Sequence, residues 1–63
     1  MEKRKVTLYM KNGNSYSVVC QDDEIYENLL QEIDNDERIS ISYSGKVISI
    51  KGSQVDYHEW EYL

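Results

Sequence analysis

The spacing of apolar residues changes twice along this chain, and these changes limit the elements that it can form. Apolar and polar residues alternate over 5–10, 15–20, 38–43 and 47–51, as they do in half-buried strands. Between the second and third of these segments, apolar residues recur at the spacing of one helical stripe, at Ile25, Tyr26, Leu29, Leu30 and Ile33. We therefore predict two strand hairpins on either side of an amphipathic helix.

The first hairpin has two candidate registers. A two-residue turn at Asn12-Gly13 would place Leu8 opposite Ser17 and mix apolar with polar side chains on both faces. A three-residue loop that begins at Lys11 instead places Leu8 opposite Tyr16, so that the apolar rows share one face. We predict the three-residue loop, with Gly13 in the left-handed region.

The helix carries signals at both ends. Asp22 or Asp23 can accept hydrogen bonds from its first free amide groups. Three residues of low helix propensity follow the apolar stripe, and the second of them, Asn35, tolerates the left-handed conformation that often ends a helix. We expect the helix to stop near Asp34.

The second hairpin and the last segment are also predicted from turn residues and the pairing of apolar residues. A two-residue loop at Ser44-Gly45 brings Ile41 opposite Ile48, so turn chemistry and apolar pairing agree. Gly52-Ser53 then interrupts the strand, and we predict a turn through Gln54 followed by a final strand. The alternative is a C-terminal helix, in which two aromatic residues three positions apart, Tyr57 and Trp60, would share a face.

The predicted fold class is α+β, with one domain over residues 1–63. We expect a single antiparallel sheet of four to five strands, in the order strand-strand-helix-strand-strand with a fifth strand at the end, and one helix packed on one face. The other face would be polar. The predicted core comprises Val6, Leu8, Tyr16, Val18, Ile25, Leu29, Leu30, Ile33, Ile39, Ile41, Ile48 and Ile50, with some of Val55, Tyr57 and Trp60.

The charge of the chain is unevenly distributed. Twelve acidic and seven basic residues give a net charge of −5, and no basic residue lies between Lys11 and Arg38. Direct nucleic-acid binding, which needs clustered Lys and Arg, is therefore not expected. The helix should present an acidic face to a protein partner, through Asp23, Glu24, Glu27 and Glu32, although such a face also serves solubility.

The aromatic residues are six tyrosines and one tryptophan, so every one carries a polar group. Such residues are favoured both at core boundaries and at protein interfaces. The final strand brings three of them to a sheet edge, and we take Tyr57, Trp60 and Tyr62 as interface candidates. Because a 63-residue chain without a disulfide has a small core, we also expect a homodimer, through a sheet edge or a patch that includes Trp60 and Tyr62.

No catalytic, metal or cofactor site is expected. His58 and Cys20 are the only histidine and thiol, and nothing in the pattern brings them together with a third group. His58 with Asp56 or Glu59 supplies fewer ligands than zinc requires. The single cysteine and the lack of a long apolar run favour a reducing, cytoplasmic location without membrane insertion.

The segment 6–14, the helix and the closing segment 55–61 resemble the layout of small uncharacterised phage and prophage proteins of Gram-positive bacteria. This resemblance implies an accessory or host-directed role and carries over no functional residue. The sequence therefore favours a small acidic, non-enzymatic protein-interaction module. The alternative is a nucleic-acid-mimicking inhibitor of a DNA-processing enzyme, in which carboxylates take the place of phosphates.

Overall fold

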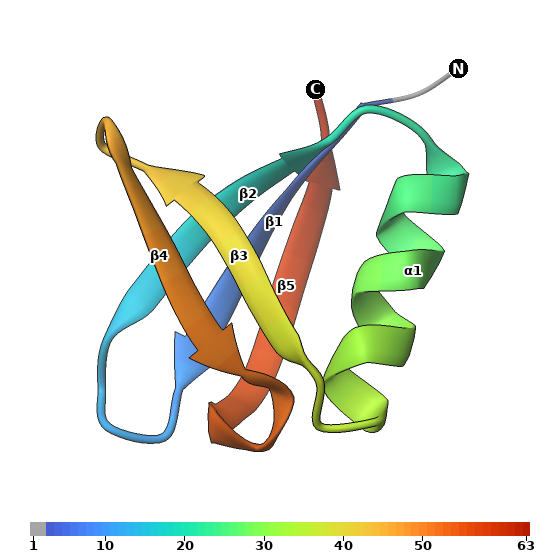
Figure 1. Ribbon diagram of the computed structural model, residues 1–63. Coiled ribbons are helices and arrows are strands. Elements are labelled where there is room, and N and C mark those ends of the chain that lie inside the picture. The colour runs from blue at the N-terminus through green and yellow to red at the C-terminus, as the bar shows by residue number, and fades with distance from the viewer. Residues whose placement is uncertain (1–2) are drawn as a thin grey trace.

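The computed structural model describes residues 3–63, which form five strands and one α-helix in chain order (Figure 1). The elements are β1 (Arg4–Met10), β2 (Ser15–Cys20), α1 (Asp23–Asp34), β3 (Arg38–Tyr43), β4 (Lys46–Lys51), a short 3-10 helix η1 (Gly52–Gln54) and β5 (Val55–Tyr62). The predicted helix and both hairpins are confirmed. The final segment is a strand after a turn through Gln54, so the alternative of a C-terminal helix is wrong.

Both hairpins have the predicted registers. In the first, Val6 pairs with Val18 and Leu8 with Tyr16, and the three-residue loop places Gly13 at φ 95°. In the second, Ile41 pairs with Ile48 across a loop in which both residues, Ser44 and Gly45, have positive φ. In each hairpin the register that puts apolar residues on one face is the one that forms, as expected where one face is buried.

The strands form two sheets, so the prediction of a single four- to five-stranded sheet is wrong. One sheet has the order β2-β1-β5, and the other contains only β3 and β4. Figure 1 shows β3 and β4 crossing in front of the three-stranded sheet, with α1 beside them. At 12 residues, α1 is about 18 Å long. It covers only part of the sheet, and the second hairpin covers the rest while burying its own isoleucines.

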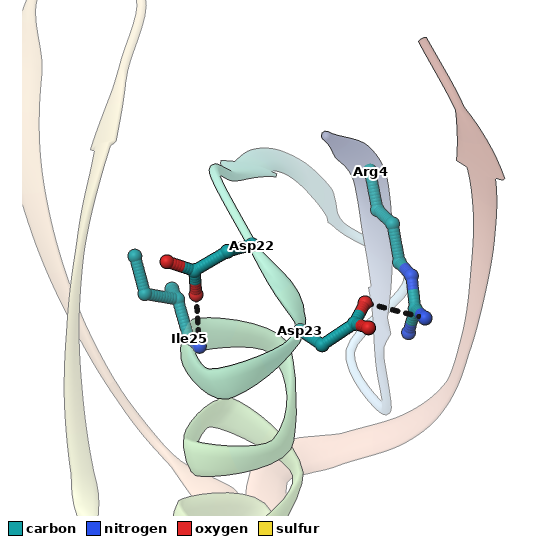
Figure 2. A network of polar contacts seen from close by, with 4 residues as sticks. All are labelled: Arg4, Asp22, Asp23 and Ile25. Atoms are coloured by element: carbon teal, nitrogen blue, oxygen red, sulfur yellow. Dashed lines mark hydrogen bonds and ion pairs between the residues drawn. The ribbon is translucent and has the colours of Figure 1, made fainter. Parts of the chain in front are cut away.

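Hydrogen bonds define both ends of α1. Oδ1 of Asp22 accepts a hydrogen bond of 2.9 Å from the amide of Ile25, which confirms the predicted N-cap (Figure 2). At the other end the amide of Glu37 donates to the carbonyl of Glu32 over 2.9 Å. The left-handed residue is Asp36, at φ 54°, and not the predicted Asn35, at φ −88°. The reason is that Asn35 is itself the C-cap of the helix, so the left-handed conformation that follows a C-cap is adopted by the next residue, Asp36.

The buried core contains residues from β1, β2, α1, β3 and β4, namely Val6, Leu8, Met10, Cys20, Tyr26, Leu29, Ile39, Ile41 and Ile50. Tyr16, Val18, Leu30, Ile33, Ile48 and Val55 pack against it, half-buried. Met10, Cys20 and Tyr26 were not in the predicted core. Ile25 was, yet 43% of it is exposed because it lies at the margin of the helical stripe, beyond the strands that cover Tyr26 and Leu29.

Candidate functional site

Arg4 lies on the inner face of the three-stranded sheet, where a charged residue is unusual. It begins β1 and is separated from Val6 by two positions and from Leu8 by four, so its side chain points to the same face as theirs. Its neighbours across the sheet are Cys20 on β2 and Tyr62 on β5. Only 13% of the Arg4 side chain is exposed. A charge this well covered must be compensated by nearby groups.

Aromatic rings surround the guanidinium group of Arg4. Its central carbon lies 4.2 Å from the ring centre of Tyr26, 4.5 Å from that of Trp60 and 5.3 Å from that of Tyr62. The rings also contact one another: Tyr26 and Trp60 are 5.9 Å apart, and Trp60 and Tyr62 meet edge to face at 4.8 Å. Each ring is within the range of a cation–π interaction, so one cation joins α1 and β5 to β1.

The charge of Arg4 is balanced by α1. Nη2 of Arg4 donates a hydrogen bond to Oδ1 of Asp23 over 2.8 Å, as Figure 2 shows. The side chain of Asp23 is 69% exposed, so this ion pair lies at the boundary with solvent. Nε of Arg4 is buried and has no hydrogen-bond partner. The rings therefore cover most of the guanidinium group, and the carboxylate meets only its outer end.

The four predicted acidic residues do not form one face. Asp23, Glu24 and Glu27 are exposed, whereas Glu32 is half-buried. Asp23 and Glu27 are four residues apart and share a side of the helix, with Glu24 next to them. Glu32 follows Asp23 by nine residues, about two and a half turns, and so projects from the opposite side. Asp23 therefore reaches the Arg4 cluster, which consists of Arg4, Tyr26, Trp60 and Tyr62, while Glu24 and Glu27 lie in the same first turns of the helix.

The three predicted interface aromatics are also divided. Trp60 and Tyr62 lie on the inner face of β5, at its end, and remain 42% and 53% exposed. Tyr57 points to the outer face, where its ring stacks on that of Tyr9 with the centres 4.5 Å apart. The cause is the alternation of side chains along a strand, which separates residue 57 from residues 60 and 62.

The structure thus joins two features that are far apart in the sequence. Arg4 connects the first turn of α1, through Asp23, to the exposed aromatic residues Trp60 and Tyr62 at the end of β5. We call this the acidic-aromatic surface, and it consists of Asp23, Glu24, Glu27, Trp60 and Tyr62. It combines exposed aromatic residues, which are enriched at protein interfaces, with charges that can attract an oppositely charged partner.

Sequence reasoning missed Arg4, although a signal was present. Arg4 occupies the same alternating row as Val6 and Leu8, and an arginine in an inward row needs partners. The partners themselves could not be found in this way. Asp23 is 19 residues away and Trp60 lies in the last strand, so only the folded arrangement brings them together.

The residues weighed for catalysis lie in different surroundings. Cys20 is fully buried, and this burial raises the pKa of its thiol, with Arg4 acting in the opposite sense. Nε2 of His58 is 3.5 Å from the hydroxyl of Tyr26. Within residues 3–63, no group of three or more His, Cys, Asp and Glu side chains is placed to hold a metal ion.

Two further observations concern similarity to known proteins and the length of the helices. Comparisons of the chain with protein-family models, curated proteins and solved structures found no match. None of the described helices is long and apolar enough to cross a membrane.

Proposed function

We propose that this protein is a non-enzymatic interaction module that binds a protein partner through the acidic-aromatic surface. The observation that carries the proposal is the Arg4 cluster. In it Arg4 packs against Trp60 and Tyr62 and pairs with Asp23, while about half of the surface of each aromatic residue stays exposed. Aromatic residues held rigidly at a surface lose little conformational freedom on binding and contribute a large contact area.

The chemistry of the surface indicates a basic partner. The carboxylates of Glu24 and Glu27 are exposed, and no ion pair within the described residues engages them. A partner with Lys or Arg near an apolar patch would match both parts of the surface, with the charges acting mainly on the association rate.

A nucleic-acid mimic fits this geometry less well. Mimicry needs a row of unpaired carboxylates, but Asp23 is paired with Arg4 and Glu32 lies on the other side of α1. Exposed aromatic rings add contact area that imitation of phosphates does not require. We therefore favour a module that recognises a basic and partly apolar protein surface.

Affinity capture tests the proposal. The immobilised protein is incubated with bacterial lysate, because the layout resembles that of small phage proteins, and captured proteins are quantified by mass spectrometry. The test variant carries Glu24→Gln and Glu27→Gln. The matched control carries Glu32→Gln and Glu37→Gln, which remove the same charge away from the acidic-aromatic surface.

We expect at least one captured protein to be reduced by the test variant and retained by the control. A protein that both variants retain equally would contradict this surface as the binding site. If the captured protein is a DNA-processing enzyme whose DNA binding this chain competes with, the mimic is the better description.

A further inference from the structure

A groove lies between β4 and the first hairpin, with Arg38 of β3 and Gln54 of η1 also in its lining. Its volume is about 350 Å³. Met10, Ile48 and Ile50 give it apolar walls, and Arg38 and Lys51 lie along it. Figure 1 shows that β4 is the strand of the second hairpin farther from α1. The groove thus follows the outer edge of β4.

The edge of β4 is open to pairing. Among residues 3–63, β4 pairs only with β3, so alternate backbone N–H and C=O groups of β4 point away from β3. An unpaired edge of this kind is a template for a further strand. Val47, on the same strand but on the opposite face from Ile48 and Ile50, is 78% exposed, so no element of the described chain covers the outer face of the hairpin at this position.

The charge of the groove is opposite to that of the whole chain. The chain carries a net charge of −5, but the two residues lining the groove that are charged at neutral pH, Arg38 and Lys51, are both basic. Nη1 of Arg38 lies 3.4 Å from the hydroxyl of Ser49, which orients the guanidinium group. Asp36 is close enough for Lys51 to lower its pKa, so part of the Lys51 charge is compensated.

We propose that this groove binds an extended acidic segment of a partner protein, which adds to the edge of β4 as a further strand. Backbone hydrogen bonds to β4 would hold the segment. Apolar side chains on its inner face would meet Met10, Ile48 and Ile50, while its carboxylates would meet Arg38 and Lys51. Lysines on an edge strand discourage indiscriminate pairing, and they become attractive only to an acidic strand. This site is separate from the acidic-aromatic surface and does not depend on it.

The test uses an acetylated and amidated octapeptide of alternating Val and Glu, with the alternating Val and Lys octapeptide as control. Each is titrated into the 15N-labelled protein, and amide chemical shifts and hydrogen exchange are followed. We expect saturable shifts in β4 and at Met10 with the Glu peptide only. Alternate amides of β4 should also exchange more slowly, because they become hydrogen-bonded.

Variants then measure how much of the peptide binding comes from charge and not from strand pairing. Changing Arg38→Gln and Lys51→Gln together should weaken binding of the Glu peptide about fivefold to tenfold, as expected for two partly exposed ion pairs. The matched control is Lys3→Gln with Lys5→Gln, which removes the same charge. Lys3 precedes β1 and Lys5 lies near its start, whereas Met10, at its end, lines the groove, and residue 5 is about 17 Å from residue 10, beyond the screening length of about 8 Å at physiological salt.

Several outcomes would overturn the proposal. Equal binding of the Lys peptide, shifts centred on β5, or an absence of shifts at millimolar peptide would each do so. Chemical-shift changes without slower amide exchange in β4 would mean that the peptide binds by charge alone and does not pair with β4 as a strand. If the protein alone shows the same shifts as its concentration rises, the occupant of the groove is a second copy of this chain.

Discussion

The guanidinium group of Arg4 lies 2.8 Å from the carboxylate of Asp23 and 4.2 Å from the ring centre of Tyr26, one helical turn further along α1. These contacts attach the start of the helix to the inner face of the sheet. The same group contacts Trp60 at the other edge of the cluster. Stability and the shape of the acidic-aromatic surface therefore depend on one residue.

A comparison of Arg4→Ala with Asp23→Asn separates the stabilisation that comes from the aromatic rings from that of the ion pair. We expect Arg4→Ala to lower the free energy of unfolding by about 2 kcal/mol, since several largely desolvated cation–π contacts are lost. Asp23→Asn should cost less than about 1 kcal/mol, because its carboxylate is largely exposed. Urea unfolding of both variants provides the measurement. Equal losses would show that the ion pair, and not the rings, holds Arg4.

The loop of the first hairpin depends on Gly13. At φ 95° a side chain is strained, although a Cβ there would meet no other atom. Gly13→Ala should therefore destabilise the protein by roughly 1 kcal/mol through the backbone alone. Thermal or urea unfolding measures this change, and an unaltered midpoint would argue against the three-residue loop.

Gly52 differs from Gly13, because a side chain at residue 52 would meet the backbone of α1. A Cβ on Gly52 would lie 2.5 Å from the carbonyl oxygen of Ile33, at the end of α1. Gly52→Ala must push η1 away from the helix, and we expect a loss of about 1–3 kcal/mol, typical of overpacking. If Gly52→Ala unfolds at the same midpoint as the wild type, the close approach of η1 to α1 is not rigid.

Asp36 should make stability depend on pH. Hydrogen bonds from Ser53, first from its side chain and then from its amide, which lies 2.8 Å from Oδ1, lower the pKa of Asp36 below its ordinary value of 3.8, and Lys51 and Lys11 act in the same direction. In the unfolded chain the carboxylate takes up a proton first as the pH falls. The stabilisation is therefore complete above that ordinary value and is lost as the pH drops through the lower, folded pKa. Unfolding measured from pH 5 to 2 should show a smaller decline for Asp36→Asn than for the wild type, whereas parallel curves would contradict the assignment.

The elements and their registers were predictable from the sequence, because the parity of apolar residues fixes both hairpins. The placement of the second hairpin was not. Its pattern shows that Ile39, Ile41 and Ile50 need cover, but not whether the hairpin extends the sheet or lies across it. The candidate site was only half predictable. Glu24, Glu27, Trp60 and Tyr62 were found separately, whereas their proximity depends on Arg4, whose partners are remote in the sequence.

A homodimer remains a separate proposal, formed through the free edge of β5 or the patch around Trp60 and Tyr62. Asp56, Glu59 and Glu61 on β5 would repel one another across such a pair of strands, so added salt should strengthen self-association. Binding of a basic partner should instead weaken with salt. Sedimentation equilibrium at tens of micromolar distinguishes a species of twice 7.5 kDa from the monomer. A monomer at both low and high salt would rule the dimer out.

The most direct test of the acidic-aromatic surface is the salt dependence of the association rate with the captured partner. We predict that Glu24→Gln with Glu27→Gln slows association and flattens its dependence on salt, because these carboxylates attract a basic surface. The control pair, Glu32→Gln with Glu37→Gln, should leave the rate and its salt dependence close to those of the wild type. Association that is insensitive to salt, or that both pairs of substitutions slow equally, would contradict the account.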